Sequence, residues 1–146
     1  MLDNLQDPGN LGTIVRTAEG AGVTAVFMSN DCVDIYNPKT IRSTMGSIYR
    51  VPFVYVDDLL ALLDKFSKRK KVTTYAAHLK GKNTYDKENY QSGTAILIGN
   101  EGNGLRDEVA EKSGCLGSDS DAGKSRIAQC AIAASILMFE VYRQRR

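Results

Sequence analysis

The feature that most constrains this chain is an apolar segment that runs directly into a glycine-rich acidic turn at residues 95–106, AILIGNEGNGLR. Its glycines, Gly99, Gly102 and Gly104, let backbone groups approach a ligand closely at the carboxyl end of a strand. Glu101 lies inside the turn and no Lys-Ser or Lys-Thr pair follows, so this is not the phosphate-binding loop of a nucleotide hydrolase. The segment predicts either a ligand read by backbone groups or ordinary turn chemistry.

The rest of the chain alternates short apolar segments with helical ones. Strands are predicted at residues 2–5, 24–29, 52–56, 72–77, 95–99 and 115–116, and helices at 10–20, from 37–38, from 57–58, at 105–112 and at 125–145. Asn10 and Asn37 are the expected N-caps of the first two helices, and Pro38 suits a first turn. Strands separated by helices imply parallel crossovers. The predicted fold class is therefore α/β, a mostly parallel sheet flanked by helices with ligands at the strand carboxyl ends.

Composition favours one soluble domain over residues 1–146. Hydrophobic residues make up 42% and charged residues 25%, and no apolar run approaches a membrane span. Three cysteines, Cys32, Cys115 and Cys130, form no C-x-x-C pair, and His78 is the single histidine. We therefore expect reduced core thiols, no metal site and a cytoplasmic location. The net charge of +2 is slight for a nucleic-acid binder, although basic clusters occur at 65–71 and 143–146.

A second motif lies near the amino terminus, where Asp7-Pro8-Gly9 forms a turn before Asn10, Gly12 and Arg16. Arg16 follows Asn10 by six residues, about 1.7 helical turns, so the two side chains do not stack on one face. A ligand that contacts both would lie across the start of the helix. Taken alone, the pattern favours an ordinary solvated arginine.

Together the two segments resemble motifs one and two of the SpoU-type (TrmH-like) branch of the SPOUT RNA methyltransferases. The residues that carry the resemblance are Asn10, Gly12 and Arg16, then Ile98-Gly99-Asn100-Glu101-Gly102, and the last helix at 131–140. The resemblance covers essentially the whole chain. It implies a carboxyl-terminal trefoil knot, a homodimer, S-adenosylmethionine as cofactor, and methylation of a ribose 2′-hydroxyl in tRNA or rRNA. Because the chain opens on the first motif, we expect no separate RNA-binding domain.

The resemblance also implies the roles of individual residues. Arg16, Glu101 and Asn10 are the catalytic candidates. Because a guanidinium stays protonated, we interpret Arg16 as a phosphate anchor whose charge lowers the pKa of the hydroxyl. Glu101 would orient Arg16 or accept a hydrogen bond from the substrate, and Asn10 would fix the opposite side. The cofactor-binding candidates are Ala77, Ile98, Gly99, Asn100, Gly102, Leu116, Asp119, Ala128 and Gln129.

The third motif departs from the family. Residues 127–129 are Ile-Ala-Gln where the family has Ser-Leu-Asn, and residues 119–121 are Asp-Ser-Asp where it has Ile-Pro-Met. Two functions therefore stay open. One is an active RNA ribose methyltransferase, and the other is a catalytically impaired dimeric module that binds RNA or cofactor on the same scaffold. A dinucleotide-binding dehydrogenase fits less well, because no G-x-G-x-x-G opens a helix after the first strand.

The last predicted helix is apolar nearly all round. Its apolar residues are Ile127, Cys130, Ile132, Ile136, Leu137, Met138, Phe139 and Val141. A helix without a polar face should be covered on two sides. One side can pack on the sheet, and a second copy of the chain is the simplest cover for the other. The alternative is the central helix of a monomer.

Overall fold

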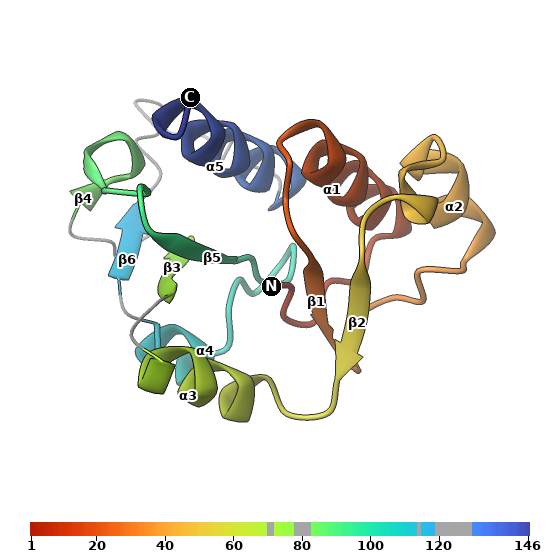
Figure 1. Ribbon diagram of the computed structural model, residues 1–146. Helices are drawn as coiled ribbons and strands as arrows, with labels where there is room; N and C mark the ends of the chain where they lie inside the picture. Colours follow the sequence, from red (N-terminus) through yellow and green to blue (C-terminus); the bar gives the residue numbers. More distant parts are fainter. Residues whose placement is uncertain (70–71, 78–82, 114, 119–129) are drawn as a thin grey trace.

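The chain folds into alternating helices and strands, which confirms the predicted α/β class. The computed structural model describes residues 1–69, 72–77, 83–113, 115–118 and 130–146 (Figure 1). The helices are α1 (Pro8–Gly20), α2 (Pro38–Thr44), α3 (Leu59–Arg69), α4 (Asp107–Glu111) and α5 (Cys130–Gln144), with short 3-10 turns η1 (Ser47–Tyr49) and η2 (Tyr85–Lys87). The strands are β1 (Val26–Ser29), β2 (Phe53–Val56), β3 (Val72–Ala77), β4 (Asn83–Thr84), β5 (Gly93–Leu97) and β6 (Cys115–Ser118).

The strands form two parallel sheets rather than one. β1 pairs with β2, and the second sheet has the order β4-β6-β3-β5. The expected first strand at residues 2–5 is reduced to isolated bridges, in which Leu2 pairs in parallel with both Met28 and Ile98. The amino terminus thus lies between β1 and β5 (Figure 1) and joins the two sheets at one end.

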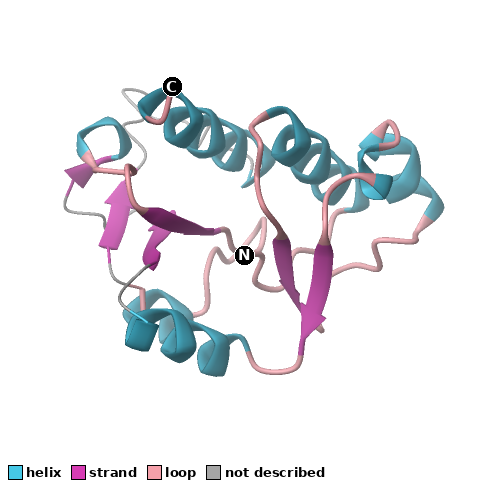
Figure 2. Cartoon of the chain, viewed as in Figure 1, coloured by secondary structure: helices cyan, strands magenta, loops and turns pink. Residues whose placement is uncertain are grey.

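Helices cover the strands from two sides. Helices α1, α2 and α5 lie along one side, and α3 and α4 lie along the other (Figure 2). The larger apolar core lies under the first layer and includes Leu5, Leu11, Val15, Met28 and Leu137, each at most 5% exposed. A smaller core lies under α3 and α4 and includes Leu63, Leu97 and Val109.

Helix α1 begins earlier than the sequence predicts. Its N-cap is Asp7, whose Oδ1 accepts the backbone N–H of Asn10 at 2.8 Å, and Pro8 occupies the first turn. The prediction that Asn10 caps this helix is wrong. Proline has no N–H to satisfy and a backbone angle suited to a helix start, so Asp7-Pro8 sets the boundary. The Asn10 side chain is thereby left for a contact outside its own helix.

Gly12 has a packing role in α1. A Cβ added there would lie 2.3 Å from the Cβ of Ser43 and 2.8 Å from the carbonyl oxygen of Thr40, both in α2. The two helices therefore approach so closely that a side chain cannot fit between them. Helix α2 itself starts as predicted, with Asn37 as N-cap accepting the Lys39 N–H at 2.9 Å.

Helix α5 is apolar on two faces over its described length. One face is buried and carries Ala131, Ala134, Leu137 and Met138. The other carries Ile132, Ile136, Phe139 and Tyr142, which are 41–46% exposed and follow a helical spacing of four, three and three residues. The predicted residues 125–129 of this helix lie outside the described residues. Within the described part of the chain, no helix is long and apolar enough to cross a membrane.

Candidate active site

The glycine-rich loop after β5 has a shape fixed by its own hydrogen bonds. Asn100 and Gly104 exchange two backbone hydrogen bonds of 2.9 Å, and the Asn100 Oδ1 accepts the backbone N–H groups of Gly102 and Asn103. A Cβ at Gly99 would lie 2.1 Å from the carbonyl carbon of Gly104 and the nitrogen of Leu105. The chain therefore crosses itself at Gly99, where no other residue fits without moving backbone.

The amino-terminal segment docks onto this loop through Glu101. The Glu101 carboxylate accepts the backbone N–H of Gln6 at 3.1 Å, the backbone N–H of Asp7 at 2.9 Å, and the side-chain amide of Asn10 at 3.2 Å. We call these three hydrogen bonds the Glu101 clamp. Asn100 adds a fourth connection, because its side-chain amide donates to the carbonyl of Asn4 at 2.9 Å. The two motifs that the sequence singled out are therefore in direct contact.

The Glu101 carboxylate is charged at neutral pH. Partial burial raises the pKa of this group, but hydrogen bonds from the backbone of Asp7, Glu101 and Gln6 and from the Asn10 side chain outweigh it, so the pKa is lowered. A charged carboxylate only accepts hydrogen bonds. In this structure Glu101 holds the start of α1, whereas the sequence predicted contacts with Arg16 or the substrate.

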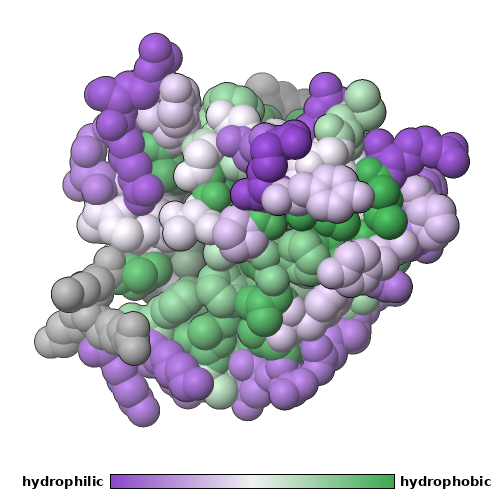
Figure 3. Space-filling view, turned by 45° about the vertical axis from the view of Figure 1, so that its right-hand side comes forward, coloured by the Kyte–Doolittle hydropathy of each residue, from purple (hydrophilic) through white to green (hydrophobic). Residues whose placement is uncertain are grey.

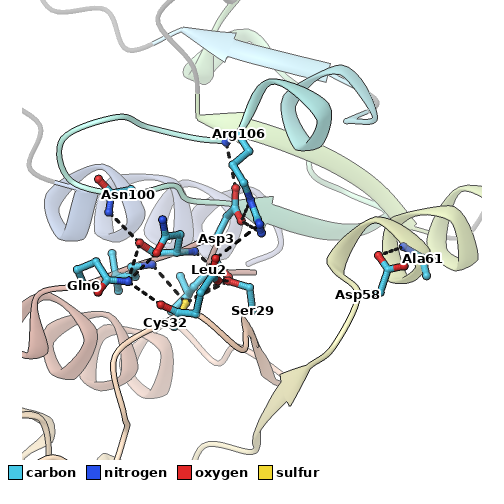
Figure 4. Close-up of polar contacts among 12 residues, drawn as sticks. Leu2, Asp3, Gln6, Ser29, Cys32, Asp58, Ala61, Asn100 and Arg106 are labelled. Atoms are coloured by element: carbon cyan, nitrogen blue, oxygen red, sulfur yellow. Dashed lines mark hydrogen bonds and ion pairs between the residues drawn. The ribbon is translucent and has the colours of Figure 1, made fainter.

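A second connection between the same segments is an ion pair. The Asp3 side chain is 1% exposed and is paired with the Arg106 guanidinium, whose Nε lies 2.8 Å from the Asp3 Oδ1. The Arg106 backbone N–H also donates to Asp3 at 3.0 Å, and its Nη1 lies 3.5 Å from a carboxylate oxygen of Asp31. Figure 4 shows Asp3 and Arg106 facing each other, with Asn100 and Gln6 beside them. Sequence reasoning missed this pair.

The structure brings together two of the three catalytic candidates. Asn10 and Glu101 are hydrogen-bonded, whereas Arg16 is exposed on α1. Among the described residues, no hydrogen bond or ion pair involves the Arg16 guanidinium. Its charge is therefore not neutralised by a neighbouring carboxylate of the described chain, and it is open to an anionic ligand.

The described cofactor-binding candidates gather at one edge of the larger sheet. Ala76 is in register with both Leu97 and Leu116, and Ala77 is in register with Gly117. This pairing places the carboxyl ends of β3, β5 and β6 side by side, with the loop at 98–102 directly after β5. The candidates there are Ala77, Ile98, Gly99, Asn100, Gly102 and Leu116, whereas Asp119, Ala128 and Gln129 lie outside the described residues.

An orphaned hydroxyl lies at the same edge. The Oγ1 of Thr84 is buried and has no hydrogen-bond partner within the described part of the chain. Thr84 is in register with Ser118 at the end of β6. This edge combines the carboxyl ends of the strands, a loop whose backbone crosses itself closely, and a hydroxyl without a partner. These features suit an organic ligand that is recognised by backbone and neutral polar groups. In the described ranges, no cluster of three or more His, Cys, Asp or Glu could hold a metal ion.

The start of α5 also lies near the clamp. Burial, followed by the nearby charges of Glu101 and Asp7, raises the pKa of Cys130 to about 12. Cys130 is a free thiol, as is the buried Cys32. The reduced state of the three cysteines stays a prediction.

We expect Cys130 to be a poor nucleophile at neutral pH. An ordinary thiol with a pKa of about 8.5 reacts through a thiolate fraction of a few per cent at neutral pH. The raised pKa lowers this fraction roughly 3000-fold, and because a more basic thiolate is also more nucleophilic, alkylation should be roughly 100-fold slower. Mass spectrometry after timed iodoacetamide treatment at pH 7 measures this rate, with the unfolded protein as reference. Glu101→Gln should accelerate the reaction by removing a nearby negative charge. Equal rates for Cys130 in the folded and unfolded chain would contradict the placement.

Comparison with known proteins gives one consistent result. The sequence model of the SpoU rRNA Methylase family matches residues 1–139. The chain is 33% identical to the 23S rRNA (guanosine(2553)-2′-O)-methyltransferase RlmP of Bacillus subtilis, covering 97% of this chain and 56% of that protein. Its fold is similar to the SpoU methyltransferase AviRb of Streptomyces viridochromogenes, with a TM-score of 0.92 and 28% identity over 99% of this chain and 58% of that one.

A third similar protein is the AdoMet-bound rRNA methyltransferase of Sinorhizobium meliloti. It superposes with a TM-score of 0.88 and 34% identity over 97% of this chain and 54% of its own. The present chain spans about half the length of the curated relatives it matches, 52% and 56% of the first two. The similarity therefore concerns one region of larger proteins, and it includes both motifs of the candidate site.

Proposed function

This chain belongs to the SpoU rRNA Methylase family, and from this premise we propose that it is an S-adenosylmethionine-dependent methyltransferase for a ribose 2′-hydroxyl of tRNA or rRNA. The similar Bacillus protein is named as a 2′-O-methyltransferase, and the similar Sinorhizobium structure contains AdoMet. The observation that carries the proposal is the Glu101 clamp. It joins the two motifs, which lie more than 90 residues apart, into one site at the sheet edge.

The cofactor would be held at the carboxyl ends of β3, β5 and β6. When bound, S-adenosylmethionine supplies an electrophilic methyl group on a sulfonium. Around it, Ala77, Gly99 and Leu116 would offer backbone groups, while Asn100 and Gly102 keep the loop in shape through their own hydrogen bond of 2.9 Å. The N–H and C=O groups of Ile98 are bonded to Met1 and Asp3, so a contact of Ile98 with the cofactor would use its side chain. The roles of Asp119, Ala128 and Gln129 in cofactor binding stay predictions.

Arg16 would be the residue that acts on the RNA substrate. The 2′-oxygen forms a bond to carbon and must lose its proton, so a nearby cation favours the reaction by stabilising the developing negative charge. Arg16 is exposed, and the planar guanidinium of an arginine matches the geometry of phosphate oxygens, which suits Arg16 to bind the adjacent phosphate and lower the pKa of the hydroxyl. Glu101 would be a positioning residue, because its hydrogen bonds fix the start of the helix that bears Arg16.

Three further features belong to the proposal. A carboxyl-terminal trefoil knot is supported by the TM-score of 0.92 with a SpoU methyltransferase. A cytoplasmic location is supported by the free thiols of Cys32 and Cys130. A single methyltransferase domain over residues 1–146 is supported by one continuous family match over 1–139.

We also propose a homodimer built on α5. The exposed stripe formed by Ile132, Ile136, Phe139 and Tyr142 gives this helix an apolar face directed away from its own core. Isologous packing of this stripe against the same stripe of a second copy would bury it by a two-fold arrangement. The dimer would combine RNA-binding surface from two chains.

The double change Ile136→Asp with Phe139→Asp should convert the dimer into a monomer, because it places two charges in a buried apolar interface. Sedimentation equilibrium at micromolar concentration measures the mass. The control is Val54→Asp on β2, at a side chain that is 44% exposed and distant from α5, which should leave the mass unchanged. A monomeric mass for the unaltered chain would refute the dimer.

The function is tested by incubating the chain with methyl-labelled S-adenosylmethionine and unmodified rRNA or tRNA. Transfer to a 2′-oxygen makes the neighbouring phosphodiester resistant to alkaline hydrolysis, so labelled dinucleotides should survive base treatment. Calorimetric titration with S-adenosylmethionine separates the alternatives. Binding without transfer would favour the impaired binding module, and absence of binding would remove S-adenosylmethionine as the cofactor in both alternatives.

A further inference from the structure

The outward surface formed by α2 and η1 carries exposed apolar and aromatic side chains. Tyr36, Ile41, Met45 and Tyr49 lie there, and their exposed fractions are 63%, 37%, 68% and 85%. Figure 3 turns this side of the molecule toward the viewer and shows apolar residues among hydrophilic ones. Within the described part of the chain, the Tyr49 side chain makes no hydrogen bond and no ring contact. Exposed apolar groups gathered in so short a segment indicate a surface that binds a partner.

Met45 ends α2 in a backbone conformation that disfavours it. This C-cap residue has a φ of 50°, in the left-handed region where glycine is the usual residue. Because 68% of Met45 is exposed, packing of its side chain offsets little of the resulting strain. Residues held in such conformations gather at functional sites. The conformation and the exposure together indicate that the Met45 side chain contacts a partner.

Arg50 connects this surface to helix α1. Its Nε and Nη2 donate to the Glu19 carboxylate, the latter at 3.0 Å, and the Ser47 hydroxyl donates to the same group. These hydrogen bonds lower the pKa of Glu19 to about 2, so the carboxylate is charged at neutral pH. A Cβ at Gly46 would lie 3.6 Å from the Arg50 Nη1, so the guanidinium lies against the turn that follows α2. No described residue accepts a hydrogen bond from this Nη1, which leaves it open to an anion.

Arg16 lies at the border of the same surface. Gly12, Arg16 and Glu19 follow one another at four and three residues, so they share one face of α1. Gly12 packs against α2, and Glu19 holds Arg50 directly after η1. Arg16 is therefore placed between these two contacts, with its guanidinium exposed beside α2 and η1.

A row of three cations thus follows α1. Lys39 of α2 lies beside the start of the helix, with its Nζ 3.7 Å from an Asp7 carboxylate oxygen and its side chain 66% exposed. Arg16 lies in the middle and Arg50 beside the end, so the row extends over about 18 Å at 1.5 Å per residue. Asp7 and Glu19 offset part of this charge. The row alone would therefore hold a phosphate backbone only weakly, and contacts with bases would have to add to the affinity.

We propose that Tyr49 and Met45 form a stacking platform for an unpaired base that flanks the target nucleotide in the RNA substrate. Proteins that bind single-stranded RNA stack splayed bases on aromatic side chains beside cationic groups. Arg50 and Arg16 would bind the phosphates on either side of that base. The inference rests on the proposed RNA substrate and narrows it to RNA that is single-stranded next to the modified ribose.

Binding of a labelled oligouridine of about twelve nucleotides tests the platform by fluorescence anisotropy, without S-adenosylmethionine. The comparison is its duplex with oligoadenosine, whose bases are already stacked on one another. Tyr49→Ala should weaken binding of the single strand about tenfold and leave binding of the duplex unchanged. Tyr49→Phe keeps the ring and should bind both as the unaltered chain does.

Met45→Gly should separate function from stability. Glycine suits a φ of 50°, so the unfolding midpoint should rise, whereas affinity for the single strand should fall about threefold. Lys39→Ala should weaken binding of strand and duplex alike and reduce the salt dependence by about one counterion, because it removes a phosphate contact. Arg42→Ala is the control on α2, outside the row and the platform, and should change either affinity by less than about twofold.

Unchanged affinity for oligouridine in Tyr49→Ala or Met45→Gly would overturn the proposal, as would an equal loss for strand and duplex in Tyr49→Ala. Absence of oligouridine binding by the unaltered chain would do the same. A change from dimer to monomer in Tyr49→Ala, measured by sedimentation equilibrium, would mean that a second copy covers this surface instead.

The measurements also separate the platform from the proposed enzyme activity. Binding that depends on Tyr49, in a chain that transfers no methyl group, would support the platform and count against the methyltransferase. Methyl transfer by the unaltered chain, with oligouridine binding that does not depend on Tyr49, would leave the methyltransferase intact and overturn the platform alone.

Discussion

Replacing Arg16 with alanine is expected to lower the rate of methyl transfer to RNA by about 100- to 1000-fold, the range typical for loss of one charge-stabilising group. The guanidinium is exposed and engages no other described residue of the chain, so its removal should leave the free energy of unfolding unchanged. The measurement is incorporation of labelled methyl groups into rRNA or tRNA, with thermal unfolding recorded for the same preparation.

Arg42→Ala is the matched control, because Arg42 is an exposed arginine near the end of α2. It should change the rate by no more than a few-fold. Arg16→Lys should recover part of the activity, since the charge returns without the two-pronged geometry of arginine. An unchanged rate in Arg16→Ala would show that Arg16 has no part in the reaction.

Gly99→Ala is expected to destabilise the fold by about 3 kcal/mol and to weaken S-adenosylmethionine binding. A methyl group there would lie 2.1 Å from backbone atoms of Gly104 and Leu105, so the loop itself must move. The loop carries Glu101, and its displacement should also loosen the amino-terminal segment. Urea unfolding measures the stability, and calorimetric titration measures the binding.

Gly102→Ala is the control in the same loop. A Cβ at Gly102 would meet only the Oδ1 of Asn100 at 3.5 Å, an ordinary contact, so stability should change by less than about 1 kcal/mol. If the two alanine variants were equally stable, the close backbone crossing at Gly99 would not be a constraint on the folded protein.

Much of the fold could be predicted from local sequence signals. Asn37-Pro38 marked the start of α2, and the strand predicted at Val72–Ala77 has the bounds of β3. The predicted ends of elements are wrong where a contact between residues distant in sequence sets them. β5 was predicted to reach Gly99, but it ends at Leu97, just before the loop crosses itself. β4 at Asn83–Thr84 was not predicted, since two polar residues carry no strand pattern of their own.

The candidate site could be predicted in its parts but not in its connections. The motifs supplied Asn10, Arg16 and Glu101, and the structure places two of them in contact. That Glu101 binds backbone N–H groups of Gln6 and Asp7 has no signal in the sequence, because every residue except proline has such a group. The Asp3–Arg106 pair was equally hidden among other charged residues.

The Glu101 clamp has a consequence for the order in which the chain can acquire its structure during synthesis. The hydrogen bonds that hold the amino-terminal segment connect residues 91 to 103 positions apart. Since a ribosome adds roughly 5 to 20 residues per second, the loop that holds α1 is synthesised on the order of 5 to 20 seconds after the helix. Contacts of such separation also slow folding of the finished chain. This segment is made before the loop that holds it, so it stays unsecured during that interval, and until then its apolar helix faces are exposed to chaperones and proteases.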